Sequence, residues 1–355
     1  MEKIEIALAC DERYFPGLIA TIASIIISSD KKYLYNFYIL DGGIKESSLN
    51  ILNKTVERFK CPVNINIIKI DINRLANLPN FFYNSSMAYA RLLLPELFKV
   101  DKLLYIDTDI VVTKNIAELW DVDIKGKCCA VCLDTKIKVI KNDCPKYEEL
   151  NLDGEKPYFN SGLMLIDMNQ FINNQIAEKT FKYLEQNKEH CQFWDQSALN
   201  VTLYNLTFWL DESWNFQTGT SSLQAKDNFN LLNDLDINIH FVTKNKPWLT
   251  YSIDFNSSLY YLLFQSLELS HLYDKAILSS KSGNTRKMRF ASYLLFYHQI
   301  KTSISKRKNK PVSSTSVIAY YTWVINHKIY LKKNRAQIQS LWNKWEERVN
   351  NSLMY

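Results

Sequence analysis

Apolar runs of strand length alternate with helical segments along residues 1–270, and this alternation limits the fold more than any other feature. The strand-like runs are residues 4–9, 35–40, 63–68, 103–106, 128–133 and 162–166. The helical patterns are residues 15–27, 46–59 and 87–94, the last followed by Pro95. Strands that alternate with helices are typical of α/β domains. We therefore expect a largely parallel or mixed central sheet flanked by helices.

The charge of the chain divides it into two parts. Of the 355 residues, 43 are Lys or Arg and 37 are Asp or Glu. Residues 271–355 hold 16 of the basic and 3 of the acidic residues, a net charge of +13, which leaves 27 against 34, or −7, for residues 1–270. This asymmetry predicts an α/β domain over 1–270 and a basic, aromatic, α-helical extension over 271–355, with a linker at 311–316.

Cysteine usage and hydropathy indicate an intracellular chain. The 7 cysteines are odd in number and lack metal-finger spacing, so we expect a reducing compartment rather than a disulfide scaffold. The first residues show no basic segment followed by an apolar run, so we expect no signal peptide. No apolar run approaches the roughly 18 residues that a membrane span requires.

Glycine-rich phosphate loops are absent from the sequence. Only 8 glycines occur, and none forms a dinucleotide-binding or Walker pattern. This excludes the commonest nucleotide-binding motifs and favours phosphate binding through a metal ion.

Two carboxylates interrupt the apolar run at residues 103–112. Asp107 and Asp109 flank Thr108, so an extended chain directs both acids to one side and Thr108 to the other. Buried carboxylates require a cation or several hydrogen bonds, and ligands of open α/β sheets bind at the carboxyl ends of strands. Oxygen ligands suit Mg²⁺ or Mn²⁺. The alternative is a turn whose aspartates cap the next helix.

Three further segments combine polar side chains with apolar flanks. Asn160 and Gly162 precede a predicted strand, where the alternative is a simple turn. Asp195 and Gln196 begin a predicted helix, and the helix dipole alone favours an acid there. The last segment contains His240 and Lys246. His240 either completes a carboxylate-rich metal site or packs in the core, and Lys246 could neutralise a phosphate.

Together these segments resemble glycosyltransferase family 8, over about residues 3–250. Members of that family are retaining enzymes of the GT-A fold, including bacterial lipooligosaccharide galactosyltransferases. The first strand of the family ends in a segment that holds uracil, here residues 9–14, with Asp11 as a base contact and Tyr14 as a stacking platform. The family's Tyr-Ala-Arg-Leu stretch is residues 89–92 and places Arg91 near the donor.

The resemblance implies a complete set of site residues. The metal ligands are Asp107, Asp109 and His240, and the catalytic residues are Asn160, Asp195 and Gln196. The residues that bind the donor are Ala9, Asp11, Tyr14, Arg91, Asp107, Thr108, Asp109, Asp134 and Lys246. Asp134 lines the donor sugar together with the catalytic residues, and Lys246 contacts the diphosphate. Three positions depart from the family pattern: Cys10 and Arg13 differ in the nucleotide segment, and Thr243 replaces a glycine at the diphosphate.

The implied reaction moves galactose or glucose from UDP-galactose or UDP-glucose to a saccharide acceptor, with Mn²⁺ or Mg²⁺ as cofactor. The resemblance favours front-face attack over double displacement, in which Asp195 would be the nucleophile. The acceptor would belong to lipopolysaccharide, capsule or glycoprotein glycan synthesis, lipid-linked or protein-linked. The alternatives are a metal-dependent nucleotidyltransferase and a catalytically silent module that binds glycan or nucleotide.

The basic extension allows three interpretations. The first is a patch at 271–355 that contacts anionic membrane, which would place a cytoplasmic enzyme at the inner face of the cell membrane. The second is a helical cap that packs on the α/β domain. The third, nucleic-acid binding, lacks a recognised fold, and we expect no nucleic-acid partner.

Overall fold

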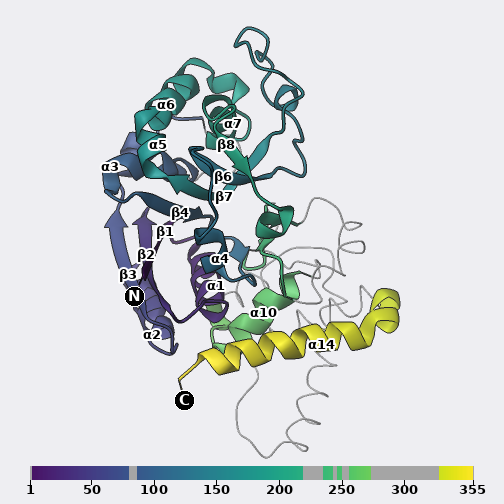
Figure 1. The fold of residues 1–355 in the computed structure, drawn as a ribbon. Coiled ribbons are helices and arrows are strands. Elements are labelled where there is room, and N and C mark those ends of the chain that lie inside the picture. The colour runs from purple at the N-terminus through teal and green to yellow at the C-terminus, as the bar shows by residue number, and fades with distance from the viewer. Residues whose placement is uncertain are drawn as a thin grey trace, which may run out of the picture.

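A seven-stranded mixed sheet forms the centre of the molecule in the computed structural model (Figure 1), which describes residues 2–79, 86–218, 235–242, 246–249, 256–272 and 328–354. In spatial order its strands are β3 (Val63–Lys69), β2 (Tyr33–Asp41), β1 (Glu2–Cys10), β4 (Lys102–Ile106), β7 (Phe159–Asp167), β6 (Cys129–Leu133) and β8 (Thr207–Trp209). β7 runs antiparallel to both of its neighbours, and the other pairs are parallel. The expected mixed sheet is confirmed.

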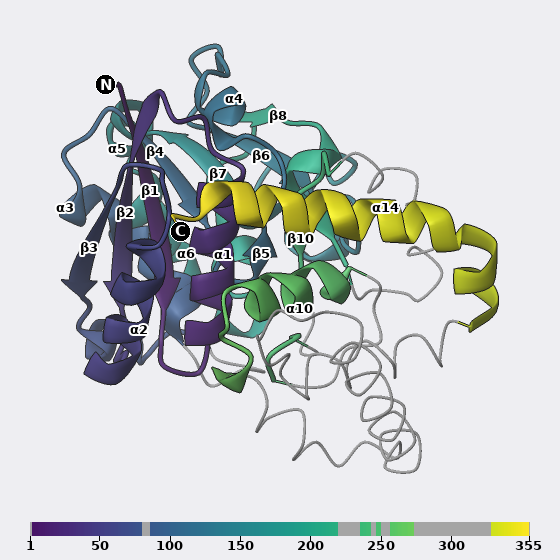
Figure 2. The same cartoon turned by 90° about the horizontal axis from the view of Figure 1, so that it is seen from below.

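Helices cover both faces of this sheet (Figures 1 and 2). One face carries α1 (Phe15–Ile27), α2 (Glu46–Val56), α4 (Ile116–Trp120), α10 (Ser257–Ser266) and α14 (Lys328–Ser352). The other carries a 3₁₀ helix at Ser86–Leu93, α3 (Leu94–Leu97), α5 (Met168–Asn173), α6 (Ile176–Gln186) and α7 (Asp195–Thr202). Shorter 3₁₀ turns lie at Ile72–Leu75, Ile140–Asn142, Lys188–His190 and Glu212–Asn215.

The sequence of β1 shows why the sheet is buried on both faces. Ile4, Ile6 and Leu8 belong to the hydrophobic cluster beneath α1, whereas Ala7 and Ala9 belong to the cluster on the opposite face. Successive side chains of a strand point to opposite faces, so a nearly continuous apolar run is needed where both faces are covered. The apolar alternation read from the sequence therefore specifies a three-layer arrangement.

A second, small sheet lies across the carboxyl end of β4. It joins β5 (Ile110–Val111), β10 (Ile239–His240) and β9 (Phe216–Gln217) in that order. β10 pairs antiparallel with β5, which sets His240 opposite Ile110, and the Phe241 amide donates to the Asp109 carbonyl at 3.0 Å. Residues about 130 positions apart are thereby joined next to the two aspartates.

Several predicted elements differ in extent from the observed ones. The helix expected over 46–59 ends at Val56, and the helix expected over 87–94 is the 3₁₀ helix, after which Pro95 sits in the first turn of α3. The strand expected over 162–166 begins at Phe159, so Asn160 lies within β7 rather than before it. Its buried amide donates to Asp134 and accepts from Gly162 and Asn215, which allows a polar side chain in that position.

The end of the basic extension packs on the α/β domain through α14, which runs beside α10 (Figure 1). Leu341, Trp345 and Val349 recur every four residues on one face of α14 and are fully buried. The Trp345 indole donates to the Leu259 carbonyl at 3.1 Å, and the Arg348 guanidinium donates to the Thr113 carbonyl at 2.8 Å. This end of the chain therefore packs as the helical-cap interpretation describes.

The remainder of the extension, 273–327, includes the predicted linker at 311–316 and lies outside the described residues. Within the described part of the chain, no helix combines the length and apolar character needed to cross a membrane.

Candidate active site

The two aspartates lie in a turn immediately after β4. The sequence predicts an extended segment here, but residues 107–109 leave the strand and turn towards β5. The turn is held from below by α1, where a Cβ on Gly17 would lie 2.3 Å from the Thr108 carbonyl oxygen. Glycine is therefore required at position 17 of α1. Thr108 is buried, and the side chains of Asp107 and Asp109 both point towards His240.

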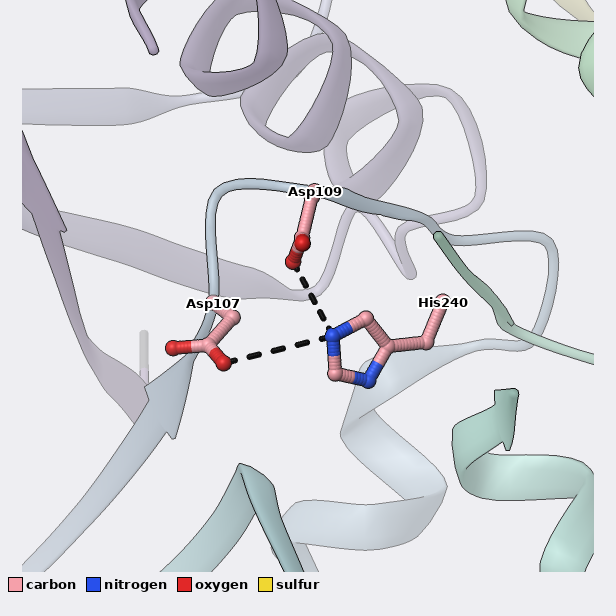
Figure 3. Close-up of side chains that lie close together, drawn as sticks. All are labelled: Asp107, Asp109 and His240. Carbon is pink, nitrogen blue, oxygen red and sulfur yellow. Dashed lines mark ion pairs between the residues drawn. The ribbon is translucent and has the colours of Figure 1, made fainter. Parts of the chain in front are cut away.

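His240 faces both carboxylates (Figure 3). Its Nε2 lies 3.0 Å from Asp109 Oδ1 and 4.0 Å from Asp107 Oδ2, and one ligand atom from each of the three residues lies within 4.8 Å of the others. The side chains of Asp109 and His240 are nearly buried, whereas Asp107 remains partly open to solvent. The structure thus brings together the three residues predicted as metal ligands.

Gly162 on β7 leaves room for this cluster. The Asp107 amide donates to the Gly162 carbonyl at 2.8 Å, which holds β7 against the turn. A Cβ at Gly162 would lie 2.3 Å from His240 Cε1 and 2.9 Å from Asp107 Oδ2. No other residue fits between the imidazole and the carboxylate without displacing one of them.

Arg91, from the 3₁₀ helix, joins two acids beneath the cluster. Its guanidinium donates to Asp107 Oδ1 at 2.8 Å and to Asp195 Oδ2 at 3.0 Å, and it also bonds the Ser161 carbonyl. Burial by itself would lower the pKa of Arg91, but the Asp107 and Asp195 carboxylates outweigh burial and raise it. Arg91 is therefore a permanent cation that neutralises part of a strongly acidic site.

Lys246 is the second cation of the site. Its ammonium bonds Asp109 Oδ2 and the Phe241 carbonyl. Burial would raise the pKa of Asp109, but the neighbouring Lys246 and His240 side chains hold it well below its ordinary value. Asp109 is consequently ionised throughout the neutral range, as a metal-binding carboxylate must be.

A second hydrogen-bonded group contains three of the predicted sugar-lining residues. Asp134 Oδ2 accepts from Asn160 Nδ2 at 3.2 Å and from Gln196 Nε2 at 3.1 Å. Gln196 Oε1 in turn accepts from the Ser161 amide at 3.0 Å. Asn160 comes from β7, Asp134 follows β6 and Gln196 begins α7, so the edge of the sheet gathers all three.

Asp195 lies one residue before Gln196 and is almost completely buried. Its Oδ2 accepts from Arg91 Nε and, at 3.3 Å, from the Ser161 hydroxyl. Desolvation by burial raises the pKa of Asp195 to about 6, against the opposing charge of Arg91. Its position in the first turn of α7 matches the expectation from the sequence.

The predicted nucleotide segment follows β1, the neighbour of β4. Ala9 is the penultimate residue of the strand, and the Tyr14 amide donates to Asp11 Oδ1 at 3.1 Å. The Tyr14 ring meets the edge of Trp248, 5.9 Å between ring centroids, and Trp248 also packs against Gly17. Thr243, noted as a departure from the family pattern, lies outside the described residues.

The chemistry of the cluster fits a divalent cation. Two carboxylates and one imidazole nitrogen form a donor set of the kind that binds Mn²⁺ or Mg²⁺. Asp109 Oδ1 is buried and has no aligned hydrogen-bond donor among the described residues, although His240 Nε2 is close to it. A cation between these atoms would satisfy both, because each has a lone pair to offer.

Sequence reasoning missed two residues of the site. Asn215, at the end of a 3₁₀ turn, contacts His240 Nδ1 at 2.8 Å, and Ser161 bonds Arg91, Asp195 and Gln196. Ser161 lies within the motif that was singled out, so its contacts follow from its neighbours. Asn215 carries no pattern of its own and could be found only once β9 and β10 are placed side by side.

Solved structures with a similar fold are glycosyltransferases. The galactosyltransferase LgtC, in complex with donor and acceptor sugar analogues, matches 69% of this chain and 89% of its own with a TM-score of 0.56 and 23% identity. The bifunctional glycosyltransferase WbbM matches 78% of this chain and 52% of its own with a TM-score of 0.62 and 22% identity. The fold is therefore the GT-A glycosyltransferase fold.

Residues 5–252 match the sequence profile of glycosyl transferase family 8, and the chain belongs to that family. The chain is thus a glycosyltransferase rather than a nucleotidyltransferase, and family membership implies a nucleotide-sugar donor and a saccharide acceptor.

The chain is also similar to several bacterial proteins. General stress protein A of Bacillus subtilis is 28% identical over 70% of this chain and 88% of its own length. Lipopolysaccharide 1,2-glucosyltransferase of Escherichia coli K12 is 27% identical over 84% of this chain and 88% of its own. Lipopolysaccharide 1,3-galactosyltransferase of Salmonella typhimurium is 24% identical over 70% and 73%.

Substitution Gly162→Ala tests the packing of the cluster. The new Cβ forces His240 away from Asp107, so we expect Mn²⁺ affinity to fall by about 10-fold or more, measured by isothermal titration calorimetry. Gly154→Ala is the matched control, because its Cβ is also crowded, 2.7 Å from the Tyr147 ring, but remote from the acids. Equal Mn²⁺ affinity in wild type and Gly162→Ala would contradict the steric argument.

The raised pKa of Asp195 predicts a specific dependence of stability on pH. Between about pH 4 and 6 the folded protein holds this proton more tightly than the unfolded chain, so stability falls as pH rises through that window. A shift of this size corresponds to about 3 kcal/mol. In Asp195→Asn the loss disappears, so its free energy of unfolding relative to wild type should rise from pH 4 to 7.

Urea denaturation in EDTA at each pH measures this difference. Loss of the Arg91 contact changes the stability of Asp195→Asn at every pH. The test is therefore how the difference in free energy of unfolding changes with pH, and not its absolute value. Parallel pH profiles for the two proteins would contradict the assignment.

Proposed function

We propose that this glycosyltransferase is a retaining hexosyltransferase that moves galactose or glucose from a UDP-sugar to a saccharide hydroxyl during synthesis of lipopolysaccharide, capsule or a glycoprotein glycan. The observation that carries the proposal is the convergence of Asp107, Asp109 and His240 at the edge of a GT-A sheet. The names of the lipopolysaccharide glucosyltransferase and galactosyltransferase relatives support hexose transfer and this setting.

Asp107, Asp109 and His240 would hold Mn²⁺ or Mg²⁺. When bound, the ion supplies a Lewis acid for the leaving diphosphate. The buried ammonium of Lys246, already beside Asp109, adds positive charge at the point where the leaving group becomes more negative. Thr108 contributes its buried turn, which holds the two acids at a fixed separation.

The uridine would lie against the segment after β1. The proposed contacts are Ala9 and Asp11 with the base and Tyr14 as the stacking surface. The support is their position: the carboxyl ends of β1 and β4 are adjacent, and α1 and Trp248 pack between the nucleotide segment and the Asp-x-Asp turn. Ligands of open α/β sheets bind at this edge.

Asn160, Asp134 and Gln196 would orient the donor sugar. Their amide and carboxylate groups form one rigid, buried network, which preorganises the polar surface that meets the sugar hydroxyls. Arg91 would act beneath them, because its ion pairs with Asp107 and Asp195 tie the metal side of the site to the sugar side.

The contacts of Asp195 favour front-face attack. A double displacement requires a nucleophile free to reach the anomeric carbon. The carboxylate of Asp195 instead accepts from Arg91 and Ser161 and is 2% exposed. Gln196 is a poor nucleophile, so its amide serves better to orient the sugar than to attack it.

Release of UDP tests the function directly. We expect release from UDP-galactose or UDP-glucose in Mn²⁺ and none in EDTA, with Asp109→Asn slower by about 100-fold. Asp123→Asn is the control, since Asp123 is an exposed acid whose contact is with the Lys125 amide. NMR of the product should show the anomeric configuration of the donor. Metal-independent release or an inverted product would overturn the proposal.

We also propose that the chain works in the cytoplasm, at the inner face of the cell membrane, through basic residues of 271–355. The support is the net charge of +13 in this segment, because each basic residue near anionic lipid contributes roughly 1 kcal/mol. The buried face of α14 packs on the α/β domain, so the basic stretches before this helix are the proposed lipid contact.

Vesicle sedimentation tests this contact in the full-length chain. Replacing Lys306, Arg307 and Lys308 together with Gln should lower binding to anionic vesicles by about 10-fold or more, given the per-residue contribution above. Replacing Lys31, Lys32 and Lys45, surface residues of the α/β domain, by Gln gives a control with the same change in charge. Equal vesicle binding by both variants would remove the membrane proposal.

A further inference from the structure

We infer that Asn215 is a positioning residue that determines which nitrogen of His240 carries the proton, and so leaves the lone pair on the nitrogen that faces the carboxylates. The inference rests on the proposed metal site and adds a residue that neither the sequence motifs nor the resemblance indicated. It depends on a chain of hydrogen bonds, Gly162 to Asn160 to Asn215 to His240, in which the role of each atom is set by the one before it.

The chain begins at a group that can only donate. The backbone amide of Gly162 donates to Asn160 at 3.0 Å, so the receiving atom must be the Asn160 carbonyl oxygen. The other end of the same amide confirms this orientation, because Asn160 Nδ2 faces Asp134 Oδ2 at 3.2 Å and a carboxylate accepts. The second oxygen of Asp134 accepts from two backbone amides, at 2.9 and 2.8 Å.

The orientation of Asn160 then fixes that of Asn215. Asn160 Oδ1 also receives a hydrogen bond from Asn215, at 2.9 Å, and the group that donates must be the Asn215 NH₂. The carbonyl oxygen of Asn215 therefore points to His240 Nδ1, 2.8 Å away. A carbonyl oxygen can only accept, so Nδ1 carries a proton whether the imidazole is neutral or charged.

The consequence lies on the other side of the ring. With Nδ1 protonated, the neutral imidazole has its lone pair on Nε2, and Nε2 is the atom that faces Asp109 Oδ1 and Asp107 Oδ2. A metal ligand requires this lone pair. The opposite tautomer would set two lone pairs against each other at Asn215 and place a proton where the cation binds.

Burial makes it costly to reverse the orientations of the Asn160 and Asn215 amides. Asn215 is 1% exposed, and Asn160 and Asp134 are each 7% exposed, so solvent does not replace a lost partner. The same Asp134 accepts from Gln196, which links the orientation of the metal ligand to the residues proposed to orient the sugar. Asn215 therefore contacts a predicted metal ligand directly and is connected, through Asn160 and Asp134, to Gln196.

The experiment reads the tautomer of His240 directly by ¹⁵N–¹H NMR of histidine-labelled, metal-free protein at a pH where the imidazole is neutral, with the signal assigned by a His240→Gln variant. Wild type should show the Nδ1–H form. Asn215→Leu, which has no acceptor, should shift His240 to the Nε2–H form and weaken Mn²⁺ binding by about 10- to 100-fold. Asn215→Asp keeps the acceptor for Nδ1 but loses the donor to Asn160, so it should restore the Nδ1–H form while recovering Mn²⁺ affinity only in part.

Asn200→Leu is the matched control. Asn200 is also a buried amide in the neighbouring network, but it bonds Phe159 and Gln196 rather than His240, so its loss should leave the tautomer unchanged. An Nε2–H imidazole in wild type, or an Nδ1–H imidazole retained in Asn215→Leu, overturns the inference.

A shifted tautomer in Asn215→Leu with unaltered Mn²⁺ affinity also overturns the inference. Should Asn215→Leu fail to fold, the tautomers of wild type and Asn215→Asp still decide the outcome. These readouts use no sugar donor. A failure of the proposed transferase activity can therefore be distinguished from a failure of this inference.

Discussion

Two ionised carboxylates held side by side at the end of an apolar strand are the constraint on which the site depends. Asp107 and Asp109 would repel each other strongly in a poorly solvated environment, so the fold must supply positive charge to both. Arg91 is bound to the first and Lys246 to the second. These two cations come from segments about 150 residues apart, so only the assembled fold brings both of them to the acids.

The crossing of two sheets satisfies this constraint geometrically. Antiparallel pairing of β4 with β7 sets Gly162 beside Asp107, and antiparallel pairing of β5 with β10 sets His240 beside Asp109. The space between is so small that Gly162 must lack a side chain. Since strand register decides which side chains meet, a shift of one residue in either pair would turn these groups to the opposite face.

Sequence reasoning found the fold and most of the site for identifiable reasons. Short, nearly continuous apolar runs predicted the strands, and the acids at 107 and 109 stood out because they interrupt one of them. Asn215 has no such signal, since a single amide between a 3₁₀ turn and a two-residue strand leaves no periodicity. Residues 341, 345 and 349 repeat every four positions, as on a buried helix face, whereas the basic residues around them favour the membrane interpretation.

The balance of charge explains why a divalent cation, rather than another basic side chain, suits this site. The site holds four carboxylates, Asp107, Asp109, Asp134 and Asp195, and two fixed cations, Arg91 and Lys246, which pair with three of these acids. A third ammonium would leave the site negative and would still repel a diphosphate. A divalent ion removes the excess and retains open coordination positions for phosphate oxygens, as a side-chain cation cannot. Under the proposed function, the acidic excess therefore serves donor binding rather than being an unresolved cost to the fold.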